Sequence, residues 1–238
     1  MADYDTVASG GAQDVDAFGY ANHTTVSKGG TETVLYDGSE NYSNIYGAEV
    51  VSAGGAATSD TVESGGTQTV RGFADGTTIS LGGTEHVFSG GAADTSQVYG
   101  SAVVSSGGSG YGDTVHTGGL FTVSSGGFVS GGLTISGGYA GISGAVASGQ
   151  KVLFVGHGDL AFYDLAAFHA TIGGYSTGDE FDLGGFAFGA GETRSYASGT
   201  LTVVDGSKTA SLSLLGSYVT SDFALSTDSH GGTFVRFV

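Results

Sequence analysis

Apolar and polar positions alternate along residues 1–150 in a short pattern that repeats about every 18 residues. Each unit starts with Thr, Asn or Gln followed by Val or Ile. The pairs are Thr6-Val7, Thr25-Val26, Asn44-Ile45, Thr61-Val62, Thr78-Ile79, Gln97-Val98, Thr114-Val115 and Thr134-Ile135. A second aliphatic residue follows eight or nine positions later, and a Gly pair such as Gly65-Gly66 lies between the two. Since Val, Ile and Thr favour strands and Gly suits tight corners, each unit predicts strand, corner, strand, corner.

Two strands of four or five residues cannot bury a core alone, but coils stacked at ~4.8 Å pair every strand with its copies above and below. The repeat therefore predicts an all-β fold, a parallel β-solenoid (β-helix) of about eight coils of ~18 residues. We expect the Val and Ile of the eight pairs to form one inward column. The alternate Thr, Ser, Gln and Glu positions are expected to face solvent.

The repeat also carries a family resemblance. Thr-Val-Glu-Ser-Gly-Gly-Thr-Gln-Thr-Val at residues 61–70 and Thr-Ile-Ser-Leu-Gly-Gly-Thr-Glu-His-Val at 78–87 resemble the AIDA-type repeats of self-associating bacterial autotransporter adhesins. The similarity covers about residues 6–145. It implies a secreted or cell-surface solenoid that acts in adhesion, aggregation or biofilm.

The composition changes near Gln150, because the last 88 residues contain nine Leu and nine Phe. This change predicts two domains, a Gly-Gly repeat solenoid over 1–150 and a β-rich C-terminal cap over 151–238. Within the cap, Asp205-Gly206 between two short apolar runs predicts a hairpin.

The stretch 168–183 and the later segments 200–206 and 228–233 resemble the terminal module of bacterial proteins exported by type I (ABC) secretion. The chain starts Met-Ala-Asp-Tyr-Asp-Thr, without the basic and apolar regions of a signal peptide. The resemblance implies export without cleavage, and we expect residues 151–238 to act as a secretion module.

Charge and composition exclude several function classes. With 6 Lys and Arg against 23 Asp and Glu, the net charge is -17, which opposes binding to nucleic acid or anionic lipid. The absence of Cys excludes disulfides and thiolate zinc sites. No apolar run approaches the 18 residues of a membrane span, so membrane insertion is not expected.

Few residues suggest chemistry. The repeated carboxylates Asp60, Asp94 and Asp113 lack nearby Lys or Arg and are expected to be solvated corner residues, so we predict no catalytic residues, no enzyme and no cofactor. Asp179, Glu180 and Asp182 cluster in a Gly-bounded loop whose oxygen ligands suit Ca²⁺, although a solvated turn is favoured because the Gly-Gly-x-Gly-x-Asp repeat is absent.

These patterns predict a non-catalytic, extracellular structural or adhesive protein. Self-association, end to end or lateral, is the expected interaction, with attachment to surfaces or a biofilm matrix as its role. Tyr residues spread through the repeats would also suit contact with cell-surface glycans. A carbohydrate-active or carbohydrate-binding β-helix protein and a phage or secretion fibre segment remain alternatives.

Overall fold

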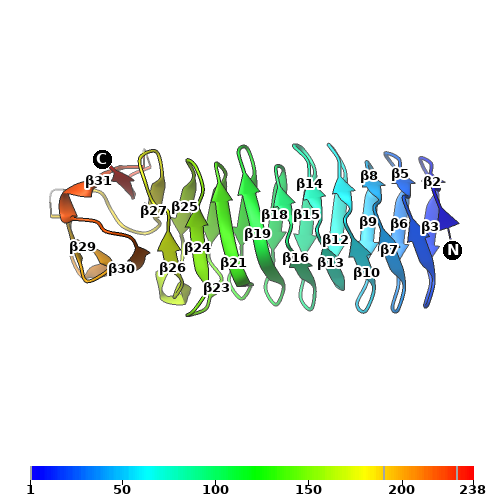
Figure 1. Cartoon of the computed structure of the whole chain (residues 1–238), viewed down its shortest axis with the longest axis horizontal. Helices are drawn as coiled ribbons and strands as arrows, with labels where there is room; N and C mark the ends of the chain where they lie inside the picture. Colours follow the sequence, from blue (N-terminus) through cyan, green and yellow to red (C-terminus); the bar gives the residue numbers. More distant parts are fainter. Residues whose placement is uncertain (1, 190, 229) are drawn as a thin grey trace.

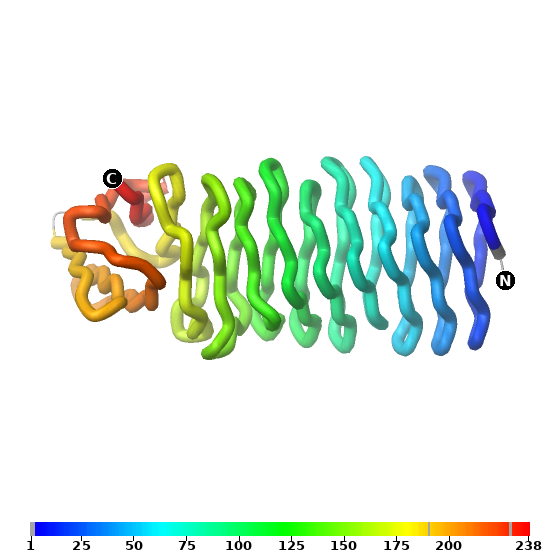
Figure 2. The backbone as a smooth tube through the Cα atoms, viewed as in Figure 1, coloured from blue at the N-terminus to red at the C-terminus, as the bar shows by residue number. Residues whose placement is uncertain are grey.

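The chain forms a rod of stacked coils that ends in a differently folded C-terminal part (Figures 1 and 2). The computed structural model describes residues 2–189, 191–228 and 230–238. Their strands make two sheets, one of 20 strands and one of 12, and neighbouring strands within the rod are parallel and in register. The predicted parallel β-solenoid is therefore confirmed, with about nine turns of ~19 residues rather than eight of ~18.

Each regular coil has three strands rather than the two that the repeat predicts. A three-residue strand and a two-residue strand, separated by a two-residue corner, lie in the larger sheet, and a four-residue strand lies in the smaller one. The larger sheet of the rod contains β1(Ala2–Asp3), β2(Thr6–Val7), β4(Tyr20–Asn22), β5(Thr25–Val26), β7(Ser39–Asn41), β8(Asn44–Ile45), β10(Ala56–Thr58), β11(Thr61–Val62), β13(Phe73–Asp75), β14(Thr78–Ile79), β16(Ala92–Asp94), β17(Gln97–Val98), β19(Ser109–His116), β21(Phe128–Ser136), β23(Ala145–Val146), β24(Lys151–Phe154) and β26(Thr171–Gly173).

The smaller sheet forms the opposite wall of the coils. Its parallel strands are β3(Ala12–Val15), β6(Thr31–Val34), β9(Ala48–Val51), β12(Thr67–Val70), β15(Thr84–Val87), β18(Ser101–Val104), β20(Leu120–Val123), β22(Tyr139–Ile142), β25(Asp159–Phe162) and β27(Glu180–Leu183). The last residue of each of these strands is a buried aliphatic or aromatic side chain.

The predicted inward column is correct at every position. Its members, Val7, Val26, Ile45, Val62, Ile79, Val98, Val115 and Ile135, are all buried. Register partners such as Val62 and Ile79 face each other across successive coils. Equivalent positions of successive coils stack directly on one another. A Val or Ile at the same position of every repeat therefore forms a continuous apolar column.

The Gly pairs form the corner between β11 and β12 and its equivalents. Gly65 has φ 82°, a conformation that L side chains rarely adopt. A Cβ at Gly66 would lie 1.9 Å from the carbonyl oxygen of Ile45 in the coil beneath. The first Gly thus provides the turn and the second provides the close approach between coils.

Parallel pairing continues past the predicted domain boundary at residue 150. β24 to β27 extend both sheets in parallel as far as Leu183, and most of the strand pairs beyond it are antiparallel. η1(Leu165–Ala167) connects β25 to β26, and the part beyond Leu183 contains β28(Thr193–Ala197), β29(Thr200–Asp205), β30(Lys208–Leu215), η2(Thr220–Asp222), β31(Phe223–Thr227) and β32(Thr233–Phe237). Whether 1–150 and 151–238 are independent domains stays a prediction.

The C-terminal strands close the end of the rod. β30 pairs with β26 of the larger sheet, and β32 pairs with β27 of the smaller one, so both sheets continue into the cap. The Asp205-Gly206 hairpin forms as predicted, with Asp205 opposite Lys208. Tyr175 and Phe181 stack with ring centroids 3.9 Å apart beneath the closing strands. No helix among the described residues is long and apolar enough to cross a membrane.

The inward column provides a direct test of the fold. Val62→Asp should lower the free energy of unfolding by several kcal/mol, because it buries an unpaired charge at a fully buried position. Thr61→Asp, at the neighbouring position whose side chain points to the other face, should change it by no more than about 1 kcal/mol. Urea unfolding followed by circular dichroism makes the comparison, and equal midpoints for the two variants would contradict the inward column.

Candidate functional site

The outer surface of the rod carries a column of aromatic rings at one corner. Tyr4, His23 and Tyr42 occupy equivalent positions in three successive coils, and each adopts a left-handed conformation with φ of 56–60°. The backbone N–H of His23 donates to the carbonyl of Asn41 in the next coil. Ring centroids of Tyr4 and His23 are 4.7 Å apart and those of His23 and Tyr42 are 5.3 Å apart, both stacked. Coil stacking therefore aligns these rings on the surface.

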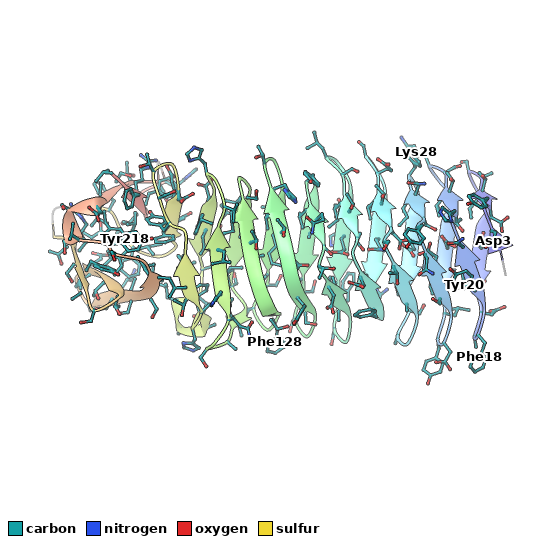
Figure 3. All side chains as sticks on the ribbon, in the orientation of Figure 1. Asp3, Phe18, Tyr20, Lys28, Phe128 and Tyr218 are labelled. Carbon is teal, nitrogen blue, oxygen red and sulfur yellow. The ribbon has the colours of Figure 1, made fainter. Side chains whose placement is uncertain are left out.

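Further apolar side chains project from other corners. Phe18 is 89% exposed, Leu81 is 74% exposed and Tyr36 is 66% exposed. Figure 3 shows Phe18 pointing away from the rod at one edge, opposite the edge that carries Lys28. Tyr99 also stacks on His116, with centroids 4.1 Å apart. Such exposed rings are available for contact with another chain or with a sugar face.

The interior contains acids that the sequence analysis placed in solvent. Glu32, Glu49, Gln68 and Glu85 occupy the second position of β6, β9, β12 and β15, and all are buried. The prediction that the alternate Gln and Glu positions face solvent is therefore wrong at these sites. The alternation of side chains along a strand indicates their burial. Each of these four residues lies two positions before an inward Val, so its side chain points to the same face as that Val.

The repeated Asp residues are also not all solvated corners. Asp60 and Asp113 are 1% exposed, so that prediction is wrong for both. Each accepts a hydrogen bond from a backbone N–H of the coil beneath, at 2.9 Å from Ser43 to Asp60 and 2.9 Å from Ser96 to Asp113. Asp94 lies on the outer face instead, in register with Asp75. The two buried carboxyls therefore link successive coils through hydrogen bonds to the backbone.

Gln68 lies between Glu49 and Glu85 in the stack of second-position residues, and its amide contacts three other buried side chains. Its Nε2 donates to Glu49 Oε2 at 2.8 Å and to Asp60 Oδ2 at 3.2 Å, while its Oε1 accepts from Thr77 at 3.2 Å. Glu40, at the centre of β7, accepts from Ser43 Oγ. One oxygen each of Glu40, Glu49 and Asp60 lies within 4.8 Å of the others. These three residues form the acidic triad of the interior.

Burial is the main cause of the perturbed acidity of these residues. Burial, followed by the charge of Glu49, raises the pKa of Glu40 to about 8. Burial and Asp113 raise the pKa of Glu85 to about 8, and burial raises the pKa of Glu32 to about 7. The pKa values of Glu49 and Asp60 are raised well above the usual carboxyl range for the same reason. Removal from water disfavours the charged form, so burial shifts each of these acids toward the protonated form.

The residues predicted as a candidate Ca²⁺ loop point in different directions. Asp179 is buried and accepts hydrogen bonds from Gly158 N at 3.0 Å and Ser176 N at 2.7 Å. Glu180 and Asp182 flank the inward Phe181, and Glu180 pairs with Arg236 at 2.6 Å. Ca²⁺ binding by Asp179, Glu180 and Asp182 stays a prediction.

Solved structures include an adhesin fragment that is similar to this chain. The crystal structure of a TibC-catalysed, hyper-glycosylated TibA fragment spanning residues 55–350 is 34% identical to this chain, with a TM-score of 0.53. The match covers 74% of this chain and 68% of the TibA fragment. TibA is an autotransporter adhesin of the AIDA family. No family model and no curated protein matches the chain.

The raised pKa of Glu85 predicts how stability depends on pH. The folded chain retains this proton up to about pH 8, whereas the unfolded chain loses it near the ordinary value of 4.5. Its stabilisation is therefore complete below pH ~4.5 and is lost as pH rises through about 8. We expect the melting temperature to fall between pH 5 and pH 8.5, and Glu85→Gln to reduce that fall by removing a contribution of a few kcal/mol.

Thermal unfolding across this pH range, with chelator present, tests the prediction. Glu63→Gln is the matched control, because Glu63 lies at an outer corner of the rod and should leave the slope unchanged. A pH slope that is the same in Glu85→Gln as in the original chain would show that Glu85 does not retain a proton in the folded state.

Proposed function

Because the chain belongs to the AIDA-type family of β-solenoid adhesins, we propose that it is a non-catalytic rod that attaches cells to surfaces and associates with its own copies in a biofilm matrix. An adhesin-like structural role and a cell-surface or secreted location follow from the family. The observation that carries the finer proposal is the alignment of exposed aromatic side chains along a rigid, repetitive surface.

Repetition gives such a rod its adhesive capacity. Tyr4 is 75% exposed and Tyr42 is 54% exposed, and the intervening His23 stacks on both rings. The aromatic corner recurs in three successive coils before Ser59 takes the equivalent position, so a second rod lying alongside can contact up to three rings of this column. Contacts that are weak alone then add up by multivalency.

Charge controls when two rods approach. The net charge of -17 makes copies of the chain repel each other at low ionic strength. The buried acids with raised pKa values contribute less to this repulsion than surface acids do. Screening shortens the reach of the repulsion from ~30 Å at 0.01 M salt to ~8 Å at 0.15 M. Association by way of exposed rings is therefore expected to need salt.

The carbohydrate alternative has one structural observation in its favour. Asp75 and Asp94 are register partners on the outer face of β13 and β16, so two accessible carboxylates lie about one coil spacing apart. That spacing is close to the ~5 Å of a retaining glycosidase pair. Asp60 and Asp113 are buried and do not contribute to such a site. A fibre segment of a phage or secretion machine would share the rod but needs partner subunits.

Self-association is tested by light scattering and negative-stain microscopy of the purified chain. We expect larger species at 0.15 M salt than at 0.01 M. The double variant Phe18→Ser/Tyr36→Ser should need about tenfold more protein for the same association, since ~1.4 kcal/mol of lost contact equals a factor of ten. Val219→Ser, an exposed cap position, is the control. A chain that stays monomeric at all salt concentrations and binds or cleaves a polysaccharide would favour the carbohydrate alternative.

Export by type I secretion is part of the proposal, with residues 151–238 as the secretion module. Deleting the last ~60 residues should leave the protein inside a Gram-negative cell that carries an ABC exporter, as measured by immunoblot of cells and medium. Val62→Asp serves as the control because it destabilises the rod and preserves the C-terminus. Undiminished secretion of the truncated chain would exclude the C-terminal address.

A further inference from the structure

The acidic triad lies buried inside the rod, and apolar packing does not explain it. Glu40 on β7, Glu49 on β9 and Asp60 between β10 and β11 come from three segments of two successive coils, and each is at most 1% exposed. Their converging oxygens lie within 4.8 Å of one another. Carboxylates that converge in this way repel each other unless something positive lies between them.

The chain supplies no positive charge to this part of the interior. The buried polar residues described in the structure are Thr24, Glu32, Glu40, Ser43, Glu49, Asp60, Gln68, Thr77, Glu85, Ser96, Asp113, Asp179 and Thr233, and none of them is Lys, Arg or His. A buried carboxylate without a cationic partner must bind either a proton or a cation from solution.

Hydrogen bonding leaves part of the triad unsatisfied. Both oxygens of Asp60 have partners, Ser43 N and Gln68 Nε2. Glu40 Oε2 and Glu49 Oε1 are buried and have no hydrogen-bond partner in the described structure. Unfilled carboxylate oxygens at full burial are rare, and they mark positions where a ligand or proton is missing.

A fourth carboxyl outside the triad gives an independent indication. Glu32 is the register partner of Glu49 in the coil beneath, and it is fully buried. Its Oε1 accepts from Gln13 at 3.3 Å, but its Oε2 has no partner. The ladder therefore places another unpartnered, buried oxygen beside the triad.

We propose that Glu40, Glu49 and Asp60 bind one Ca²⁺ ion inside the solenoid, with Glu32 as a further oxygen donor from the neighbouring coil. Ca²⁺ takes oxygen ligands at about 2.3–2.6 Å in irregular geometry, so oxygens no more than 4.8 Å apart can share one ion. Mg²⁺ fits less well, because it requires near-octahedral geometry at about 2.0–2.1 Å and retains its waters. The ion would tie coils two, three and four together from within.

Burial also determines how the ion enters. The triad is covered by the walls of both sheets, so Ca²⁺ must be taken up while the coils close and must leave by opening them. Binding is then coupled to folding of the N-terminal half of the rod, and exchange in the folded chain should be slow.

The test refolds the chain from denaturant with Ca²⁺ or with EDTA at pH 8, removes free metal by gel filtration and measures bound metal by mass spectrometry. We expect Glu49→Gln to lose about one bound Ca²⁺ per chain relative to the unsubstituted protein, because the proposed site binds a single ion. Gln already occupies this column at Gln68, the register partner of Glu49, so the variant should fold. Glu63→Gln on the outer face is the matched control and should retain the ion.

Melting temperature supplies a second readout. EDTA during refolding should lower it for the unsubstituted chain and for Glu63→Gln, but not for Glu49→Gln. Glu40→Gln replaces Glu49→Gln if the latter does not give a folded circular dichroism spectrum. Absence of retained Ca²⁺ in the unsubstituted chain would overturn the proposal and indicate that protons neutralise the triad. Ca²⁺ retained equally by Glu49→Gln would place the bound ion elsewhere, which also overturns it.

Discussion

In-register parallel pairing between successive coils is the constraint on which the rest of the structure depends. Once Thr61 and Val62 pair with Thr78 and Ile79, every position of the repeat stacks on its copy in the next coil. A one-residue slip would turn the inward column to solvent. The apolar core, the Gly corners and the stacked surface rings all follow from this pairing, because each is one residue position multiplied along the rod.

The same constraint makes the interior acids costly. A single buried carboxyl can find donors, as Asp113 does at the backbone of Ser96. Stacking places Glu32 directly beside Glu49, so two carboxyl groups at equivalent positions are neighbours inside the rod. The chain interrupts the column with the neutral amide of Gln68, whose donors serve both Glu49 and Asp60. Toward the C-terminus the column becomes apolar at Ala102 and Phe121, where the larger core of the cap end begins.

Much of this architecture could be predicted from the sequence, because the repeat fixes relative position. The inward Val and Ile column, the Gly-Gly corners and the Asp205-Gly206 hairpin follow from spacing and turn chemistry. The third strand of each coil was missed because three residues such as 56–58, Ala-Ala-Thr, carry too little pattern. The interior acids are hard to predict because Glu and Gln usually face solvent, although the two-residue offset of Glu49 from Val51 places both on one face of the strand. No sequence pattern indicates that Glu40, Glu49 and Asp60 converge, since that depends on how the two sheets face each other.

A disulfide across two coils tests the in-register stack most directly, because the chain has no Cys of its own. Thr61 and Thr78 are register partners, so their Cα atoms lie about one strand spacing apart, within the ~4.4–6.8 Å that a disulfide spans. Thr61→Cys/Thr78→Cys should oxidise to an intramolecular disulfide, seen as a mass loss of two hydrogens and the absence of free thiol. Thr61→Cys/Ser80→Cys, displaced by two residues along the strand, should remain reduced. Equal oxidation of both pairs, or oxidation of the displaced pair alone, would contradict the stacked solenoid.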